Sequence, residues 1–105
     1  MKIAITSSGN IVSAQLDQRF GRCAYFAFYD TESKSVEFVE NTNKDAAEGA
    51  GPASVATVAN RQVSKIISGE FGFKIKGMLN DLNIQMVMIK ENKTIQDIID
   101  LLEQK

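Results

Sequence analysis

At 105 residues the chain has room for one ordinary domain, and 44% hydrophobic with 24% charged residues is the composition of a globular protein able to build a core. Lysines and arginines number 12 against 13 aspartates and glutamates, and this net charge of −1 does not indicate a nucleic acid or an anionic membrane as partner. The chain has no histidine and one cysteine, so it offers no histidine base or ligand and no internal disulfide. We therefore expect a single domain over residues 1–105, in the reducing cytoplasm and without a membrane span.

The first half of the chain predicts three short strands. Residues 2–6 (KIAIT) are mostly β-branched and run into the turn cluster SSGN, which indicates a buried strand. A polar loop follows to about residue 22, and residues 25–29 (YFAFY) form the next expected strand. Apolar and polar residues alternate over residues 35–40, so we expect this segment to pair back on 25–29 as a hairpin.

A loop over residues 41–51 separates these strands from a half of the chain in which helices and strands alternate. Pro52 stands where a helix would begin, because its fixed φ and missing N–H suit the first helical position. Residues 53–60 are small and predict a helix that can lie close to a sheet. Residues 63–68 (VSKIIS) predict the fourth strand, which ends at a glycine.

The remaining elements are two helices and a strand between them. Residues 72–82 predict an amphipathic helix, and residues 84–89 (IQMVMI) predict the fifth strand. Thr94, with Asp97 three residues later, resembles a capping box that starts the last helix. The apolar residues at helical spacing are Phe71, Ile75, Met78, Leu79 and Leu82 for the first helix, and Ile95, Ile98, Ile99 and Leu102 for the last.

The order β-β-β-α-β-α-β-α predicts an α/β fold, a mixed five-stranded sheet with helices packed on it. If the first, fourth and fifth strands are parallel and the second is antiparallel beside the first, then the loops over residues 8–23, 41–51 and 69–72 meet at one edge. That edge holds the carboxyl ends of the parallel strands, where ligands of open α/β sheets bind. Two of the loops also lead into helix N-termini, whose free N–H groups attract anions.

The candidate binding residues come from these three loops. They are Ser8, Arg19, Gly21, Arg22, Cys23, Gly49, Gly51, Gly69 and Gly72. The arginines are able to clamp an anionic ligand, or else to form salt bridges with Asp17, Asp30 or Glu40. The glycines either let backbone N–H groups approach a ligand or serve as tight turns. Phe20 is expected to anchor the first loop in the core.

Cys23 has two interpretations. It is either a thiolate metal ligand, with a pKa lowered by Arg19 and Arg22, or a small apolar residue at the entry to a strand. The sequence shows no carboxylate pair, Ser/His/Asp set or Cys/His set, so we expect a protein that is not an enzyme.

Four segments, MKIAITSSGN, RFGRCAYF, GAGPA and IISGEFGFKIKGML, together resemble the family of dinitrogenase iron–molybdenum cofactor biosynthesis proteins, the nitrogenase accessory factors. The resemblance extends from Lys2 to about Ile89 and implies a ribonuclease H-like fold. It also implies that the chain binds, carries or inserts an iron–sulfur-type or iron–molybdenum-type cluster without catalysis, in the company of a protein that donates or accepts the cluster.

A single thiolate does not hold such a cluster alone, since protein-bound clusters normally take about four cysteine ligands. The cargo would then be shared between subunits, bound in transit or held by other groups, and the chain would be a monomer or a weak homodimer. The alternative is a metal-free module that binds a small molecule or anion in the same pocket, or one that binds another protein.

Overall fold

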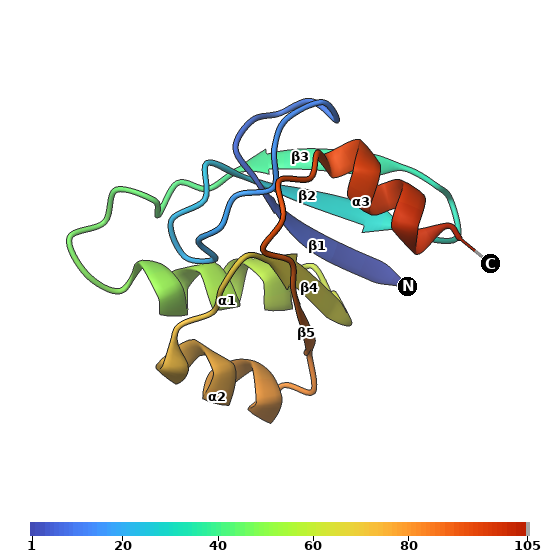
Figure 1. Cartoon of the computed structure of the whole chain (residues 1–105). Coiled ribbons are helices and arrows are strands. Elements are labelled where there is room, and N and C mark those ends of the chain that lie inside the picture. The colour runs from blue at the N-terminus through green and yellow to red at the C-terminus, as the bar shows by residue number, and fades with distance from the viewer. Residues whose placement is uncertain (105) are drawn as a thin grey trace.

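A computed structural model describes residues 1–104 of the chain (Figure 1). Its eight elements follow the predicted order β-β-β-α-β-α-β-α. The strands are β1 (Lys2–Ser7), β2 (Tyr25–Asp30), β3 (Val36–Glu40), β4 (Lys65–Ser68) and β5 (Gln85–Met88), and the helices are α1 (Ala50–Asn60), α2 (Phe73–Asp81) and α3 (Ile95–Leu102). No helix within residues 1–104 has the length and hydropathy needed to cross a bilayer.

The five strands form one mixed sheet in the order β3-β2-β1-β4-β5. β2 is antiparallel to both of its neighbours, while β1 and β4, and β4 and β5, pair in parallel. The predicted mixed five-stranded α/β sheet is therefore confirmed. Because β1, β3, β4 and β5 point the same way, all four end at one side of the sheet, which we call the carboxyl edge.

Helices cover both faces of the sheet, and Figure 1 shows α1 and α2 on one side and α3 on the other. Strand alternation explains the two cores, because neighbouring residues of β1 point to opposite faces. Ala4 joins the cluster under α1 and α2, which includes Phe26 and Leu79. Ile3 and Ile5 join the cluster under α3.

The start of α1 differs from the prediction. The helix begins at Ala50, so Pro52 is its third residue and not its first. The first intrahelical hydrogen bond runs from the N–H of Ala53 to the oxygen of Gly49, at 3.1 Å. N–H groups before that bond have no partner inside a helix, so proline is tolerated anywhere in the first turn. Gly49 precedes the helix with a φ of 78°, a left-handed conformation that glycine adopts without strain.

Three strands and one helix are shorter than predicted, and β3 begins one residue late, at Val36. Val63 and Ile84 are buried but lie outside β4 and β5. The prediction included them because a buried residue next to a strand has the same hydropathy as one inside it. Leu82 caps α2 and is 50% exposed, so it does not extend the apolar stripe into the core. The predicted capping box of α3 is confirmed, with Thr94 and Asp97 exchanging two hydrogen bonds of 3.0 Å.

Buried polar side chains gather near the carboxyl edge. Within residues 1–104 they are Thr6, Ser7, Asn41, Ser54 and Ser68. Thr6 donates a hydrogen bond from its hydroxyl to the oxygen of Asp17, at 2.7 Å, and its Oγ1 lies 3.0 Å from Oγ of Ser68. No buried side-chain nitrogen or oxygen in the described part of the chain lacks a partner. The carboxyl edge therefore joins its loops to the strands through satisfied hydrogen bonds.

Candidate functional site

An open pocket of about 390 Å³ lies at the carboxyl edge, between the β1–β2 loop and the start of α2. Its lining residues are Arg19, Phe20, Gly21, Arg22, Glu70, Phe71, Gly72 and Ile75. Four of the nine predicted site residues belong to this lining, namely Arg19, Gly21, Arg22 and Gly72. The predicted meeting of the first and third loops is thus confirmed.

The two arginines have different partners. Nε of Arg19 lies 3.5 Å from a carboxylate oxygen of Asp17, which also accepts the backbone N–H of Arg19 at 3.0 Å. Arg22 instead donates from Nη1 to the backbone oxygens of Lys44 and Ala46, both at 2.8 Å. Nε and Nη2 of Arg22 have no partner among residues 1–104. Both arginines therefore keep donors without a partner among residues 1–104, namely Nη1 and Nη2 of Arg19 and Nε and Nη2 of Arg22. Asp17 offsets part of the charge of Arg19, whereas no carboxylate within residues 1–104 pairs with Arg22.

The amino end of α2 adds positive potential to the pocket. Gly72 is the residue before the helix and lines the pocket, and no side chain caps the free N–H groups there. The first turn also contains no acidic residue. The backbone N–H groups of the first turn carry the positive end of the helix dipole, which favours an anion.

One carboxylate opposes this potential. Glu70 lies in the lining, and its side chain is 3.8 Å from Nζ of Lys90. Both side chains are largely exposed, so water and salt screen the negative charge of Glu70. The pocket as a whole therefore favours an anion, and Arg22 and the start of α2 supply most of that preference.

The floor of the pocket is apolar. Phe20 is 2% exposed and packs against Phe26 and Phe71, with ring centroids 5.9 and 5.6 Å apart. Phe20 thus anchors the β1–β2 loop in the core, as predicted. Ile75 completes the floor from the first turn of α2. A ligand that has weakly hydrated faces as well as negative charge would fit an apolar floor beside the arginines and the start of α2.

The expectation that arginines lower the pKa of Cys23 is wrong. The residue is fully buried, and burial, with a smaller contribution from the charge of Asp17, raises the pKa of its thiol to about 12. Its Sγ donates to the oxygen of Phe20 at 3.3 Å. Arg19 and Arg22 are directed to other partners. No group of three or more potential ligands among His, Cys, Asp and Glu gathers within residues 1–104. A ligand role for Cys23 stays a prediction, and it requires the loop to move.

We predict that Cys23 of the native protein resists alkylation by iodoacetamide at neutral pH. A pKa raised from 9.0 to about 12 lowers the thiolate fraction about a thousandfold, and burial slows the reaction further. Mass spectrometry of native and urea-unfolded protein measures the two rates. A cysteine placed at exposed Ser33 in a Cys23→Ala background is the control and should react rapidly. Equal rates for native and unfolded Cys23 would contradict the buried placement.

Three predicted glycines face their own chain. A Cβ on Gly21 would lie 3.0 Å from Cα of Gly51, and one on Gly51 would lie 2.7 Å from Cδ1 of Ile75. A Cβ on Gly69 would lie 2.5 Å from Cα of Gln18. The position of a side chain is therefore taken at each of these glycines by a packed neighbouring segment, which supports the tight-packing alternative, and a ligand role for their backbone N–H groups stays a prediction.

The other two predicted residues outside the lining are Ser8 and Gly49. Ser8 is exposed, and its backbone N–H donates to the oxygen of Gln15 at 2.9 Å. Gly49 has nothing within 4 Å of an added Cβ, so its left-handed turn explains it. Neither contributes to the pocket described above.

Two positioning residues were missed by the sequence interpretation. Asn41 is 2% exposed and donates from Nδ2 to the oxygens of Gly21 and Cys23, at 3.1 and 2.9 Å. Ser54, buried in α1, donates to the same oxygen of Gly21 at 3.3 Å. Together they fix the segment that carries Arg22. The position of Asn41 directly after β3, at the predicted ligand edge, was the available signal.

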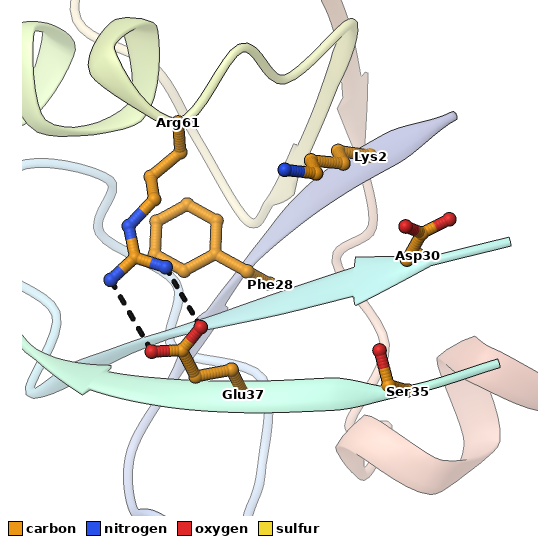
Figure 2. Close-up of a pocket in the computed structure, with 6 residues that line it drawn as sticks. All are labelled: Lys2, Phe28, Asp30, Ser35, Glu37 and Arg61. Carbon is orange, nitrogen blue, oxygen red and sulfur yellow. Dashed lines mark hydrogen bonds and ion pairs between the residues drawn. The ribbon is translucent and has the colours of Figure 1, made fainter. Parts of the chain in front are cut away.

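A second pocket, of about 220 Å³, lies at the opposite edge of the sheet (Figure 2). Its lining residues are Lys2, Phe28, Asp30, Ser35, Glu37 and Arg61. Arg61 stacks over the ring of Phe28 at 4.8 Å and pairs with both carboxylate oxygens of Glu37, at 2.8 and 3.4 Å. These hydrogen bonds lower the pKa of Glu37. The lining contains two cations and two carboxylates, and Arg61 is already paired with Glu37. This pocket therefore favours neither a positively nor a negatively charged ligand.

Comparison with known proteins places this fold among relatives of one family. The family model described as dinitrogenase iron-molybdenum cofactor matches residues 1–105. The apo form of the orange protein from Desulfovibrio gigas is similar with a TM-score of 0.89 and 25% identity, over 96% of this chain and 85% of that one. A putative NifB protein from Thermotoga is similar with a TM-score of 0.83 and 35% identity, over the same two shares. No curated protein matches the chain.

Proposed function

The chain belongs to the dinitrogenase iron-molybdenum cofactor family, and from this membership we propose that it binds an iron–sulfur-type metallocluster as cargo, without catalysing a reaction of its own. The observation that carries the proposal is Arg22, whose Nε and Nη2 have no partner among residues 1–104, in the lining of a pocket bounded by the uncapped start of α2. The pocket favours negative charge, and sulfide-rich clusters are anionic.

The donor set decides how such a cargo would be held. Clusters bound through protein ligands normally take about four cysteines, and the chain has one, which is buried. The cargo would therefore keep its own sulfide or a partner's ligands. The chain would contribute hydrogen bonds from Arg22 and from backbone N–H groups, and the apolar floor of Phe20, Phe71 and Ile75. Weak attachment of this kind suits a carrier that passes its cargo on.

Three further assignments accompany this proposal. We propose a ribonuclease H-like class for the fold, which the mixed sheet order and the family support. We propose that a protein that donates or accepts the cluster is the physiological partner, because the family is named for a cofactor that is assembled from parts. We propose the cytoplasm as the location, since a lone cysteine in the thiol form suits a reducing compartment.

Metal analysis of anaerobically purified protein tests the function most directly. We expect iron or molybdenum together with sulfide in the purified protein, or uptake of iron and sulfide during anaerobic reconstitution followed by absorbance. Protein that is free of metal and refuses reconstitution would overturn the proposal. The same measurement on Cys23→Ala tests the ligand role of that thiol. Because Cys23 is buried, we expect uptake to persist, and its loss would make Cys23 a ligand.

The alternative is a metal-free module that binds a small anion in the same pocket. The free donors of Arg22 and the uncapped α2 support it equally, since neither is specific for a metal cargo. Titration of the metal-free protein with molybdate or with inorganic phosphate, followed by NMR, separates the two. Saturable shifts at Gly72 and Arg22 in a protein that never takes up iron and sulfide would favour this alternative.

A further inference from the structure

The outer face of α2 carries an unusual set of exposed residues. Phe73, the first residue of the helix, is 95% exposed. Gly77, one turn later, has nothing within 4 Å of an added Cβ. Ile75 and Leu79 point the other way and are buried, and Figure 1 shows α1 on one side of α2 and no element on the opposite side. We call the exposed set Phe73, Lys74, Gly77, Asn80 and Asp81 the outer face.

No contact within residues 1–104 explains why these side chains are left exposed. A phenylalanine left in water gains none of the free energy of burial. A glycine inside an exposed helix is less favourable than alanine, and here no neighbour requires the absence of a side chain. Lys74 and Asp81 form no ion pair with another residue within 1–104. All of these features are explained if another backbone crosses α2 at Gly77.

The face is self-complementary. Phe73 and Asp81 lie four residues before and after Gly77, at about 6 Å along the axis in each direction. Lys74 and Asp81 are seven residues apart, almost two full turns, so they lie on the same flank of the helix. When a twofold axis at Gly77 relates α2 to an antiparallel copy, this flank of one helix lies on the same side of the interface as the same flank of its copy. Lys74 then lies beside Asp81 of the partner subunit, at nearly the same height.

We propose that the chain forms a weak twofold homodimer through this outer face, with the two α2 helices antiparallel and crossing at Gly77. Each Phe73 packs on the carboxyl end of the partner helix, and Lys74 pairs with Asp81 of the partner subunit in two symmetric ion pairs. Lys76, on the other flank near the axis, approaches its own copy, and this repulsion keeps the dimer weak. The occupant is a second copy because both signs of charge that the interface needs lie on one helix.

Sedimentation equilibrium of the cargo-free protein, from micromolar to millimolar concentration, tests the proposal independently of any metal. We expect a reversible monomer–dimer equilibrium. Lys74→Asp and Asp81→Lys should each weaken dimerisation about tenfold, because each places like charges opposite one another. The double variant Lys74→Asp/Asp81→Lys should restore it. Lys76→Gln should tighten the dimer, and Asp45→Lys, at an exposed site in the loop between β3 and α1, should leave it unchanged.

Each outcome has one meaning. A wild-type chain that stays monomeric at millimolar concentration overturns the dimer. Dimerisation that the double variant does not restore overturns this interface, as would an effect of Asp45→Lys equal to that of Asp81→Lys. All four substitutions change exposed side chains, and circular dichroism of the monomers verifies that folding is intact.

Discussion

Gly69→Ala should lower the free energy of unfolding by about 3 kcal/mol, the cost of forcing extra volume into a packed site. The added Cβ would lie 2.5 Å from Cα of Gln18 and 2.1 Å from its Oε1. A side-chain end can rotate away, but the backbone of Gln18 cannot move without the loop. That loop is held by the hydroxyl of Thr6, which donates to the oxygen of Asp17. Urea unfolding of the dilute protein measures the change.

Gly77→Ala is the matched control for this substitution. The same methyl group at Gly77 meets nothing within 4 Å and lies inside a helix. It should therefore raise the free energy of unfolding by about 0.5–1 kcal/mol, through helix propensity. The same substitution is therefore expected to lower the free energy of unfolding at Gly69 and to raise it at Gly77. Equal effects would contradict the close contact between Gly69 and the β1–β2 loop.

Arg22→Gln should reduce uptake of iron and sulfide in anaerobic reconstitution by about ten- to a hundredfold. Hydrogen bonds to charged groups contribute about 1.5–3 kcal/mol each, and the variant loses a pocket cation whose Nε and Nη2 have no partner within residues 1–104 and whose charge no carboxylate offsets there. Arg19→Gln should have a smaller effect, because Asp17 already offsets that charge. Iron and sulfide bound per chain, across a range of reagent concentrations, is the measurement.

Arg61→Gln controls for the loss of one positive charge from the chain. Arg61 lies in the other pocket, where it pairs with Glu37, so cargo uptake should not change. The fold should tolerate Arg22→Gln, since the bonds to Lys44 and Ala46 that it removes are at the exposed surface, where water replaces them. Uptake that falls equally in both variants would mean that total charge, and not the pocket, governs binding.

Local chemistry explains which parts of the fold were predictable. The capping box of Thr94 and Asp97 is a contact between near neighbours, and the strand pattern of β1 and β2 repeats over a few residues. The mixed sheet followed from the order of elements, since parallel crossovers have one hand. The position of the pocket followed in turn, because strands that point the same way end at the same edge.

The remaining errors concern properties that depend on distant parts of the chain. Cys23 stands next to an arginine in sequence, yet its pKa is decided by the loops that bury it. Gly69 and Gln18 lie fifty-one positions apart in the sequence, and no local pattern shows that they touch. In the sequence Asn41 looks like an ordinary loop residue, and only the structure shows that it donates hydrogen bonds to the oxygens of Gly21 and Cys23. The packing between loops is therefore the part of the structure that the sequence pattern did not predict.

The hydrogen bonds that Asn41 and Ser54 donate to the oxygen of Gly21 affect the rate at which the pocket would bind a ligand. A pocket whose wall is already ordered loses little conformational entropy when a ligand arrives, so no folding step slows capture. For the proposed cargo, no conformational step would then limit association, and affinity would be set mainly by how quickly the cargo leaves. With few direct bonds to break, the residence time of that cargo would be short. We therefore expect such a site to exchange its contents rapidly, so that the concentration of the cargo, and not a conformational trigger, would determine when the site is loaded and when it is empty.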